Sequence, residues 1–210
     1  LNQAFRYAAE PFVFKYFKNT SNDAESQESK RGLALTTDWF VVVLSIGLIC
    51  TLSARVFIEV LIDERYEEGL YILPILLLAN VCYAIHTQLS FWYKLIDKTM
   101  YGMVITICGA IVTLVMTLVL IPSLGYEGAA WATLASYITM MVLSYCLGQK
   151  INPYPYNVSR AMILISVSMG FGMISWHFAS VYLYPQVACL IGYCVFLWYF
   201  QVLPGKKNQF

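Results

Sequence analysis

Charged residues are scarce in this sequence, and long parts of it contain none. Asp, Glu, Lys and Arg make up 12% of its 210 residues and hydrophobic residues 60%, whereas about a quarter of the residues of a soluble domain are charged. Charge is absent from residues 69–93, 99–126, 128–149 and 161–205. A bilayer core takes about 20 apolar residues of helix per crossing, so each of the first three runs predicts one transmembrane helix and the last predicts two.

A shorter apolar run, 39–54, continues through residues 56–58 and predicts a sixth span. Residues 1–17 have the composition of the end of a further helix. The predicted fold is therefore an all-α, polytopic transmembrane helix bundle with six full spans plus the tail of a seventh. We expect the end of a transmembrane helix at 1–18, a cytoplasmic loop at 19–36, four helices of one lobe within 37–150, and a linker with two extra helices within 151–210.

Signals of other protein classes are missing as well. No basic patch is dense enough to predict a nucleic-acid partner. The six cysteines lie singly, without metal-ligand or redox spacing. The spans contain no nucleophile elbow, phosphate-binding glycine loop or pair of catalytic carboxylates. The sequence thus predicts no enzyme, no cofactor and no metal site.

The first residue is Leu1 rather than Met, and no signal peptide precedes the apolar runs. We expect the chain to be the C-terminal half of a longer protein. Its partners would then be the lipid bilayer and an N-terminal lobe of the same protein.

Lysines and arginines lie almost entirely on alternate connections between the spans. Ten of them lie on one set of connections: before the first full span, between the second and third, between the fourth and fifth, and after the sixth. Only Arg55 and Arg65 lie on the opposite set, and Arg6 is set aside as intramembrane. Basic residues stay on the cytoplasmic side of a membrane. This pattern predicts a cytoplasmic C-terminus.

Arg6 and Glu10 form the sharpest candidate site. Arg6 precedes Lys15, which marks the membrane interface, by nine residues, and is therefore about 13 Å deeper in the bilayer. An arginine there costs about 2.5–3.5 kcal/mol, so it needs a partner or a watery cavity. Either Arg6 meets an anionic substrate group such as a diphosphate, or it forms with Glu10 a structural ion pair facing a neighbouring helix.

Polar residues also follow one face of the second full span. Asn80, Tyr83, Thr87, Ser90 and Lys94 are spaced by three or four residues, which places them on one side of a helix. This face either lines a hydrophilic cavity that binds sugar hydroxyls or joins helices through polar contacts. His86 lies beside the face; it either titrates in a proton-coupled step or is packed and neutral.

Small residues recur at helical spacing along the third and fourth spans. The third span carries Gly102, Thr106, Gly109, Thr113 and Thr117, and the fourth carries Gly128, Ala132 and Ser136. Small side chains let helix backbones approach each other closely in lipid. We expect these residues to serve packing rather than chemistry.

Five segments, in order along the chain, resemble the C-terminal half of bacterial polysaccharide exporters of the multidrug/oligosaccharidyl-lipid/polysaccharide exporter superfamily. The segments are AFRYAAEPF (4–12), EGLYILPILLLAN (68–80), SFWYKLIDKTMYG (90–102), LIPSLGYEGAAWATL (120–134) and SYCLGQKINPYPY (144–156). The resemblance covers roughly residues 1–160.

The resemblance implies two six-helix lobes around a central cavity, often with two further helices. It also implies the activity: an undecaprenyl-diphosphate-linked oligosaccharide, as used in lipopolysaccharide or polysaccharide biosynthesis, would cross the bacterial inner membrane by alternating access. This chain would supply the second lobe of such a flippase. The resemblance supplies no catalytic residues.

Two alternatives remain open at this point. A cation-coupled multidrug exporter on the same fold would carry an acidic residue deep in a span, and Glu10 is the candidate within the sequence. An integral-membrane glycan polymerase or acyltransferase would need catalytic Arg, His or Asp groups in a sizeable outer loop or within the membrane.

The distribution of basic residues makes the orientation testable. A green fluorescent protein fused after Lys207 should fluoresce, and alkaline phosphatase at the same position should be inactive, because the C-terminus is expected in the cytoplasm. The converse pair of results would reverse the orientation of every span.

Overall fold

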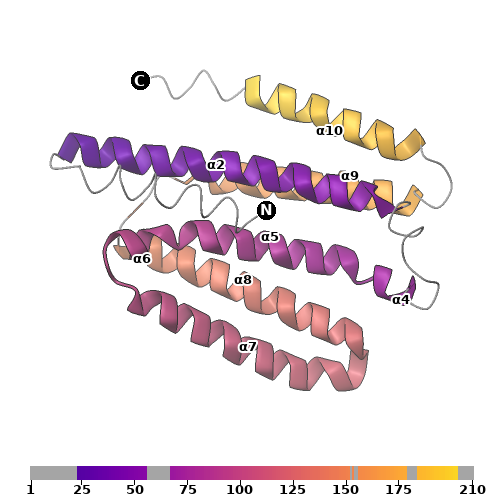
Figure 1. Ribbon diagram of the computed structural model, residues 1–210, viewed down its shortest axis with the longest axis horizontal. Helices are drawn as coiled ribbons and strands as arrows, with labels where there is room; N and C mark the ends of the chain where they lie inside the picture. The colour runs from indigo at the N-terminus through magenta and orange to yellow at the C-terminus, as the bar shows by residue number, and fades with distance from the viewer. Residues whose placement is uncertain (1–22, 56–66, 152, 154–155, 179–183, 203–210) are drawn as a thin grey trace. The chain divides into compact units, whose positions relative to one another are not determined.

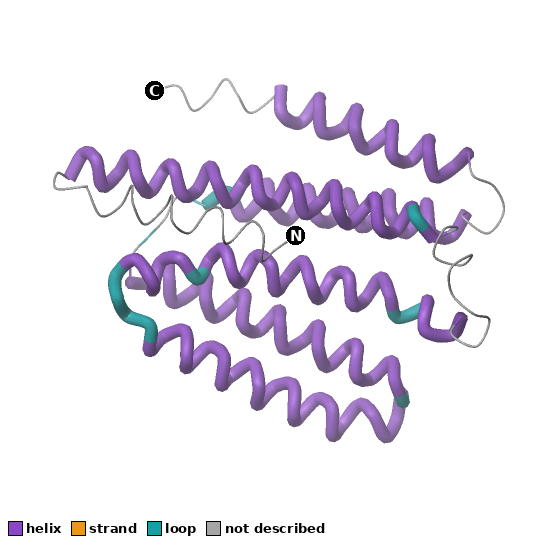
Figure 2. Tube along the Cα trace, viewed as in Figure 1, coloured by secondary structure: helices purple, strands orange, loops and turns teal. Residues whose placement is uncertain are grey.

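The computed structural model describes residues 23–55, 67–151, 153, 156–178 and 184–202, and every regular element in them is an α-helix (Figures 1 and 2). The helices are α2 (Asp23–Ser53), α4 (Glu67–Leu70), α5 (Leu73–Leu89), α6 (Phe91–Leu95), α7 (Met100–Leu124), α8 (Tyr126–Ile151), α9 (Val158–Phe178) and α10 (Tyr184–Val202). The all-α fold predicted from the sequence is confirmed.

Five stretches of helix in the described residues are long and apolar enough to cross a membrane. They are Thr36–Ser53, Leu73–Leu95, Met100–Leu124, Tyr126–Ile151 and Val158–His177. The predicted sixth span corresponds to α10, whose apolar part, Gln186–Tyr199, is shorter. The expected tail of a seventh, at 1–18, lies outside the described residues. The chain is a multi-pass helical membrane protein.

The predicted loop at 19–36 is wrong for the part that the structure describes. Helix α2 begins at Asp23 and continues without a break into the span. Its first two turns, DAESQESKR, consist mainly of Ala, Glu, Gln, Lys and Arg, which are strong helix formers. The polarity of these residues indicates exposure to water, but they form a helix rather than an irregular loop. A membrane-spanning helix can thus extend beyond the bilayer as a polar helix.

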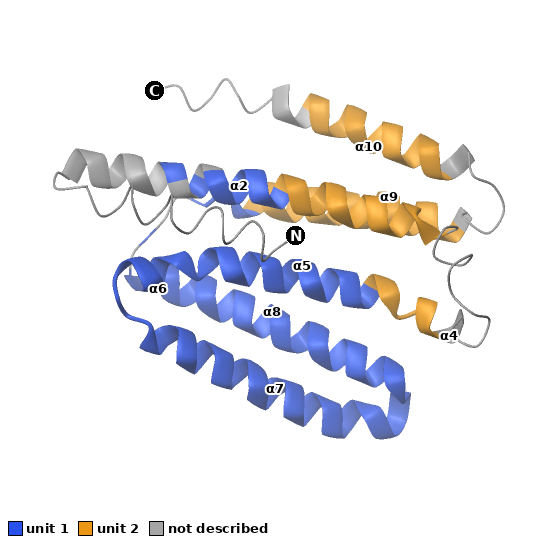
Figure 3. Cartoon of the chain, viewed as in Figure 1, with its two compact units in different colours: residues 1–41, 75–158 blue, residues 42–74, 159–210 orange. Residues whose placement is uncertain are grey.

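The chain divides into two compact units (Figure 3). One consists of residues 1–41 and 75–158, and the other of residues 42–74 and 159–210. This division differs from the sequence-based one, which kept residues 37–150 together. The second half of α2 belongs instead with α9 and α10.

Hydrogen bonds between helices explain this second unit. The Tyr193 hydroxyl of α10 donates to Ser45 Oγ of α2 over 2.6 Å. Ser175 Oγ of α9 donates to Ser53 Oγ of α2 over 3.0 Å. All four side chains are buried. Between helices in lipid such bonds contribute about 0.6 kcal/mol on average, and they fix which faces meet.

The end of α2 is also attached to α9 in this unit. Arg55 Nη1 donates to the Trp176 carbonyl over 3.0 Å, and its guanidinium carbon lies 4.7 Å from the centre of the Trp176 ring. A cation over an indole face adds electrostatic attraction to the hydrogen bond.

The first unit is built around Trp92. Its side chain is fully buried, and its Nε1 donates to the Ser144 carbonyl of α8 over 3.1 Å. Tyr101 at the start of α7 packs on it, with ring centres 5.5 Å apart. The short helix α6 is thereby fixed to both helices that follow it.

The turn between α7 and α8 shows why glycine is needed there. Helix α7 continues two residues past Pro122, to Leu124, and Gly125 closes it with φ +59°. A Cβ on Gly128 would lie 2.5 Å from the Leu120 carbonyl oxygen. Positive φ and close backbone contact both favour a residue without a side chain.

Packing around Trp92 predicts the effect of adding one methyl group to α8. A Cβ on Gly148 would lie 2.9 Å from Trp92 Cδ1 and Nε1, whereas a Cβ on Gly170 of α9 would meet nothing within 4 Å. Gly148→Ala should therefore lower the free energy of unfolding in detergent by about 1–3 kcal/mol. Gly170→Ala, the control, should leave it unchanged or raise it by up to about 1 kcal/mol. Equal effects would show that Trp92 does not restrict α8.

Candidate functional site

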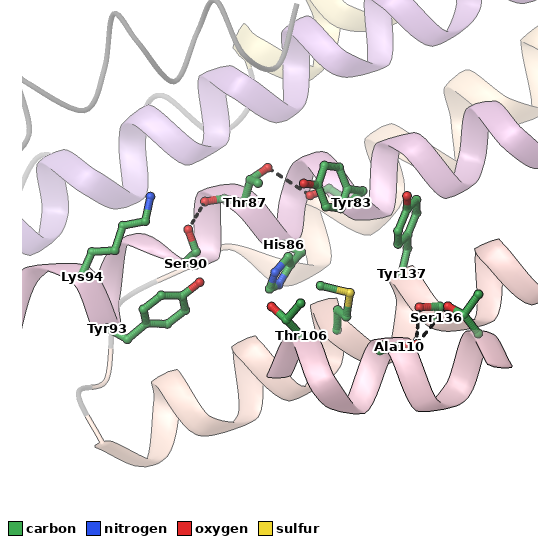
Figure 4. Close-up of a pocket in the computed structure, with 13 residues that line it drawn as sticks. Tyr83, His86, Thr87, Ser90, Tyr93, Lys94, Thr106, Ala110, Ser136 and Tyr137 are labelled. Carbon is green, nitrogen blue, oxygen red and sulfur yellow. Dashed lines mark hydrogen bonds between the residues drawn. The ribbon is translucent and has the colours of Figure 1, made fainter. Parts of the chain in front are cut away.

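A pocket of about 420 Å³ lies within the first unit, among α5, α6, α7 and α8 (Figure 4). Its wall consists of Tyr83, His86, Thr87, Ser90, Tyr93, Lys94, Thr106, Gly109, Ala110, Thr113, Ser136, Tyr137 and Met140. The volume falls in the range of about 300–1,000 Å³ that is typical of small-molecule sites. All the helices that line it carry membrane-spanning stretches.

The hydroxyl groups of this wall donate to helix carbonyls. Thr87 Oγ1 donates to the carbonyls of Tyr83 (3.0 Å) and Ala84 (2.7 Å) one turn earlier in α5. The same pattern holds for Ser90, Thr106 and Thr113, which donate to Thr87, Gly102 and Gly109. A hydroxyl has one hydrogen and two lone pairs. The hydroxyls of Ser90, Thr106 and Thr113 thus retain acceptor capacity for a ligand.

A close approach of α7 and α8 forms one side of the pocket. Ser136 Oγ of α8 donates to the Gly109 carbonyl of α7 over 2.8 Å, and a Cβ on Gly109 would lie 2.5 Å from the Met140 sulfur. The packing role predicted for Gly109 and Ser136 is confirmed. The prediction was incomplete, because Thr106, Gly109 and Thr113 also line the pocket.

Aromatic rings cover another side. The Tyr83 and Tyr137 rings lie 4.9 Å apart between centres, and His86 follows at 6.3 Å from Tyr83. Figure 4 shows the His86 ring on the side of α5 that faces Thr106 and Tyr93. Only 5% of the His86 side chain is exposed, so whatever satisfies its nitrogens lies in the pocket or its wall.

The structure places most residues of the polar face predicted from the sequence around the pocket. Tyr83, Thr87, Ser90 and Lys94 all line the pocket. Asn80 does not: it is exposed, and its Nδ2 donates to the Leu76 carbonyl over 2.8 Å. Arg6 and Glu10 lie outside the described residues.

His86 was expected beside this face, but it lines the pocket. The spacing already contained the signal, because His86 follows Tyr83 by three residues and precedes Ser90 by four. Both intervals place side chains on a shared helix face.

The charge of the site comes from Lys94, whose Nζ lies 5.6 Å from the centre of the Phe91 ring. None of the described lining residues is acidic. Among the described residues, no group of three or more His, Cys, Asp or Glu side chains could hold a metal ion. The arrangement can bind a ligand that brings hydrogen-bond donors and tolerates a nearby positive charge.

No family model, curated protein or solved structure matches this chain. The fold and the pocket define its class: a multi-pass helical membrane protein with a polar pocket among spanning helices.

The bond between Ser136 and Gly109 predicts a stability difference. Ser136→Ala should lower the free energy of unfolding in SDS titrations by about 0.5–1.5 kcal/mol, because it removes a buried bond between two helices. Ser123→Ala is the matched control, since the Ser123 hydroxyl is exposed and bonds within its own helix, to Leu120. If the two variants behave alike, the contact between α7 and α8 does not depend on this bond.

Proposed function

We propose that this chain is part of a membrane transporter that translocates lipid-linked oligosaccharide or polysaccharide precursors across the bacterial cytoplasmic membrane by alternating access. The observation that carries the proposal is the polar pocket among spanning helices. Polar side chains within a membrane are costly and mark substrate pathways. Transporters of this mechanism bind their substrates between helices near the middle of the bilayer.

The chemistry of the pocket wall suits a sugar. Sugar hydroxyls are donors, and the wall offers hydroxyl lone pairs on Thr106 and Thr113. The rings of Tyr83 and Tyr137 offer flat apolar surface, which packs against the C–H face of a pyranose. Lys94 supplies a positive charge for an anionic group.

The resemblance of the five sequence segments to polysaccharide exporters supports the same function. In this proposal the pocket belongs to the C-terminal lobe, an N-terminal lobe of the same protein completes the transport path, and the C-terminus is cytoplasmic. Arg6 remains a candidate for contact with the diphosphate, and Glu10 a candidate cavity residue one helical turn away.

The two alternatives receive less support from the pocket. A cation-coupled drug exporter calls for an acidic side chain in the membrane, and the described lining residues include Lys94 but no carboxylate. A polymerase or acyltransferase calls for catalytic groups in contact with one another. The wall hydroxyls instead donate to helix carbonyls.

Thr113, which donates to the Gly109 carbonyl, tests the role of the pocket. In a strain that lacks its own glycan exporter, the full-length protein should restore surface glycan, and Thr113→Val should reduce export about twofold to tenfold, the effect of one lost neutral hydrogen bond. The substitution keeps the side-chain shape and removes one acceptor from the wall.

Thr139→Val is the matched control. Thr139 also donates to a carbonyl of its own helix, that of Ala135 at 2.8 Å, but it is not part of the pocket wall. Its variant should export at the wild-type level. Unchanged surface glycan in the Thr113 variant would remove the pocket from the transport path. Altered drug susceptibility with unchanged glycan on deleting the gene would favour the drug exporter.

A further inference from the structure

Nδ1 of His86 is the one polar atom of the described pocket wall that is buried without a hydrogen-bond partner. Leaving a buried acceptor unpaired costs about 1–3 kcal/mol, so native structures rarely do so without a reason. The atom lies in a pocket of ligand size, which suggests that a ligand supplies the missing partner.

The chemical character of Nδ1 follows from the other side of the ring. The His86 ring is hydrogen-bonded to the backbone of Met140, whose own N–H lies inside α8 and is used by the helix. The contact is therefore from a ring N–H to a carbonyl, and Nε2 is the nitrogen that carries the hydrogen. In this tautomer Nδ1 is an acceptor.

No described group of the pocket wall donates a hydrogen bond to Nδ1 of His86. Ser90 and Thr106 have given their hydroxyl hydrogens to the carbonyls of Thr87 and Gly102. Tyr93 is hydrogen-bonded to Ser90 as well. Near His86 the hydroxyls of Ser90 and Thr106 thus face the pocket with lone pairs (Figure 4).

Ligands that bring donors include neutral hydroxyl or amide compounds and ammonium compounds. Lys94 carries a positive charge in the same wall, which disfavours a cation. The acceptors and the Tyr83 and Tyr137 rings suit a sugar.

We propose that this pocket holds one sugar residue of the transported glycan, with a ring hydroxyl donating to Nδ1 of His86. The inference rests on the proposed function, and it makes His86 a residue that determines which sugar is accepted. A sugar that lacks this hydroxyl, or that carries it in the opposite configuration, would leave Nδ1 unpaired. Sites that hydrogen-bond a substrate hydroxyl discriminate strongly against analogues that lack it.

The test uses the purified full chain in detergent and needs no variant at first. Saturation-transfer NMR would measure binding of methyl glycosides of glucose, galactose, mannose and N-acetylglucosamine, followed by the monodeoxy analogues of the best ligand. We expect millimolar binding of at least one glycoside. We also expect a loss of about tenfold or more for one monodeoxy analogue and small losses for the others.

Variants then assign the loss to His86. In His86→Leu the chosen glycoside should bind about tenfold more weakly, and its monodeoxy analogue should no longer be disfavoured. His86→Asn should recover much of the discrimination, because the Asn Oδ1 stands close to the position of Nδ1. His177→Asn is the matched control and should bind like the wild type, since His177 lies in α9 of the other unit.

Several results would overturn the inference. Absence of binding by every glycoside would do so, as would equal binding of all monodeoxy analogues, which would leave only a water molecule on Nδ1. Wild-type discrimination in His86→Leu would also do so. Failure of the proposed function is separate: glycosides would then bind in a His86-dependent way while the full-length protein restores no surface glycan.

Discussion

Lipid offers no hydrogen bonds, and this constraint governs the arrangement of the whole chain. Each polar group in a span must find its partner inside the protein. Here the hydroxyls of Thr51, Thr87, Thr113, Thr133 and Thr139 bond carbonyls one turn earlier in their own helices. The spans can therefore carry hydroxyl groups at little cost. A smaller set, Ser53, Ser136 and Ser175 among them, bonds across helices and selects neighbours.

The same constraint gives the pocket its chemistry. A hydroxyl whose hydrogen is bonded to the backbone faces the pocket with its lone pairs alone, so a wall built from Ser and Thr becomes rich in acceptors. Gly109 contributes by letting α8 approach, which brings Ser136 and Met140 to the pocket edge. Packing and ligand binding thus use the same small residues.

Most of the fold could be predicted from the sequence, because charge-free runs and helical residue spacing are properties of short, contiguous segments. The polar face with Tyr83, Thr87, Ser90 and Lys94 was predicted for the same reason. The part of the site on α7 and α8 was not, since which side chains of one helix meet those of another depends on close tertiary contacts such as Ser136 with Gly109. His86 was assigned to a position beside the polar face, although it lines the pocket. The helical start of α2 was missed because its polarity was taken for irregular backbone, and the second unit could not be read from chain order.

Helix α7 has a bare outer surface: only 11% of its spanning residues are buried, and Thr106 and Ala110 of the pocket wall are themselves exposed. Among the described residues, α7 alone separates the pocket from that exposed side. If the chain carries lipid-linked glycans, as proposed, a headgroup that enters past α7 remains joined to a hydrocarbon tail in the bilayer, and the length of that tail places no demand on the size of the pocket.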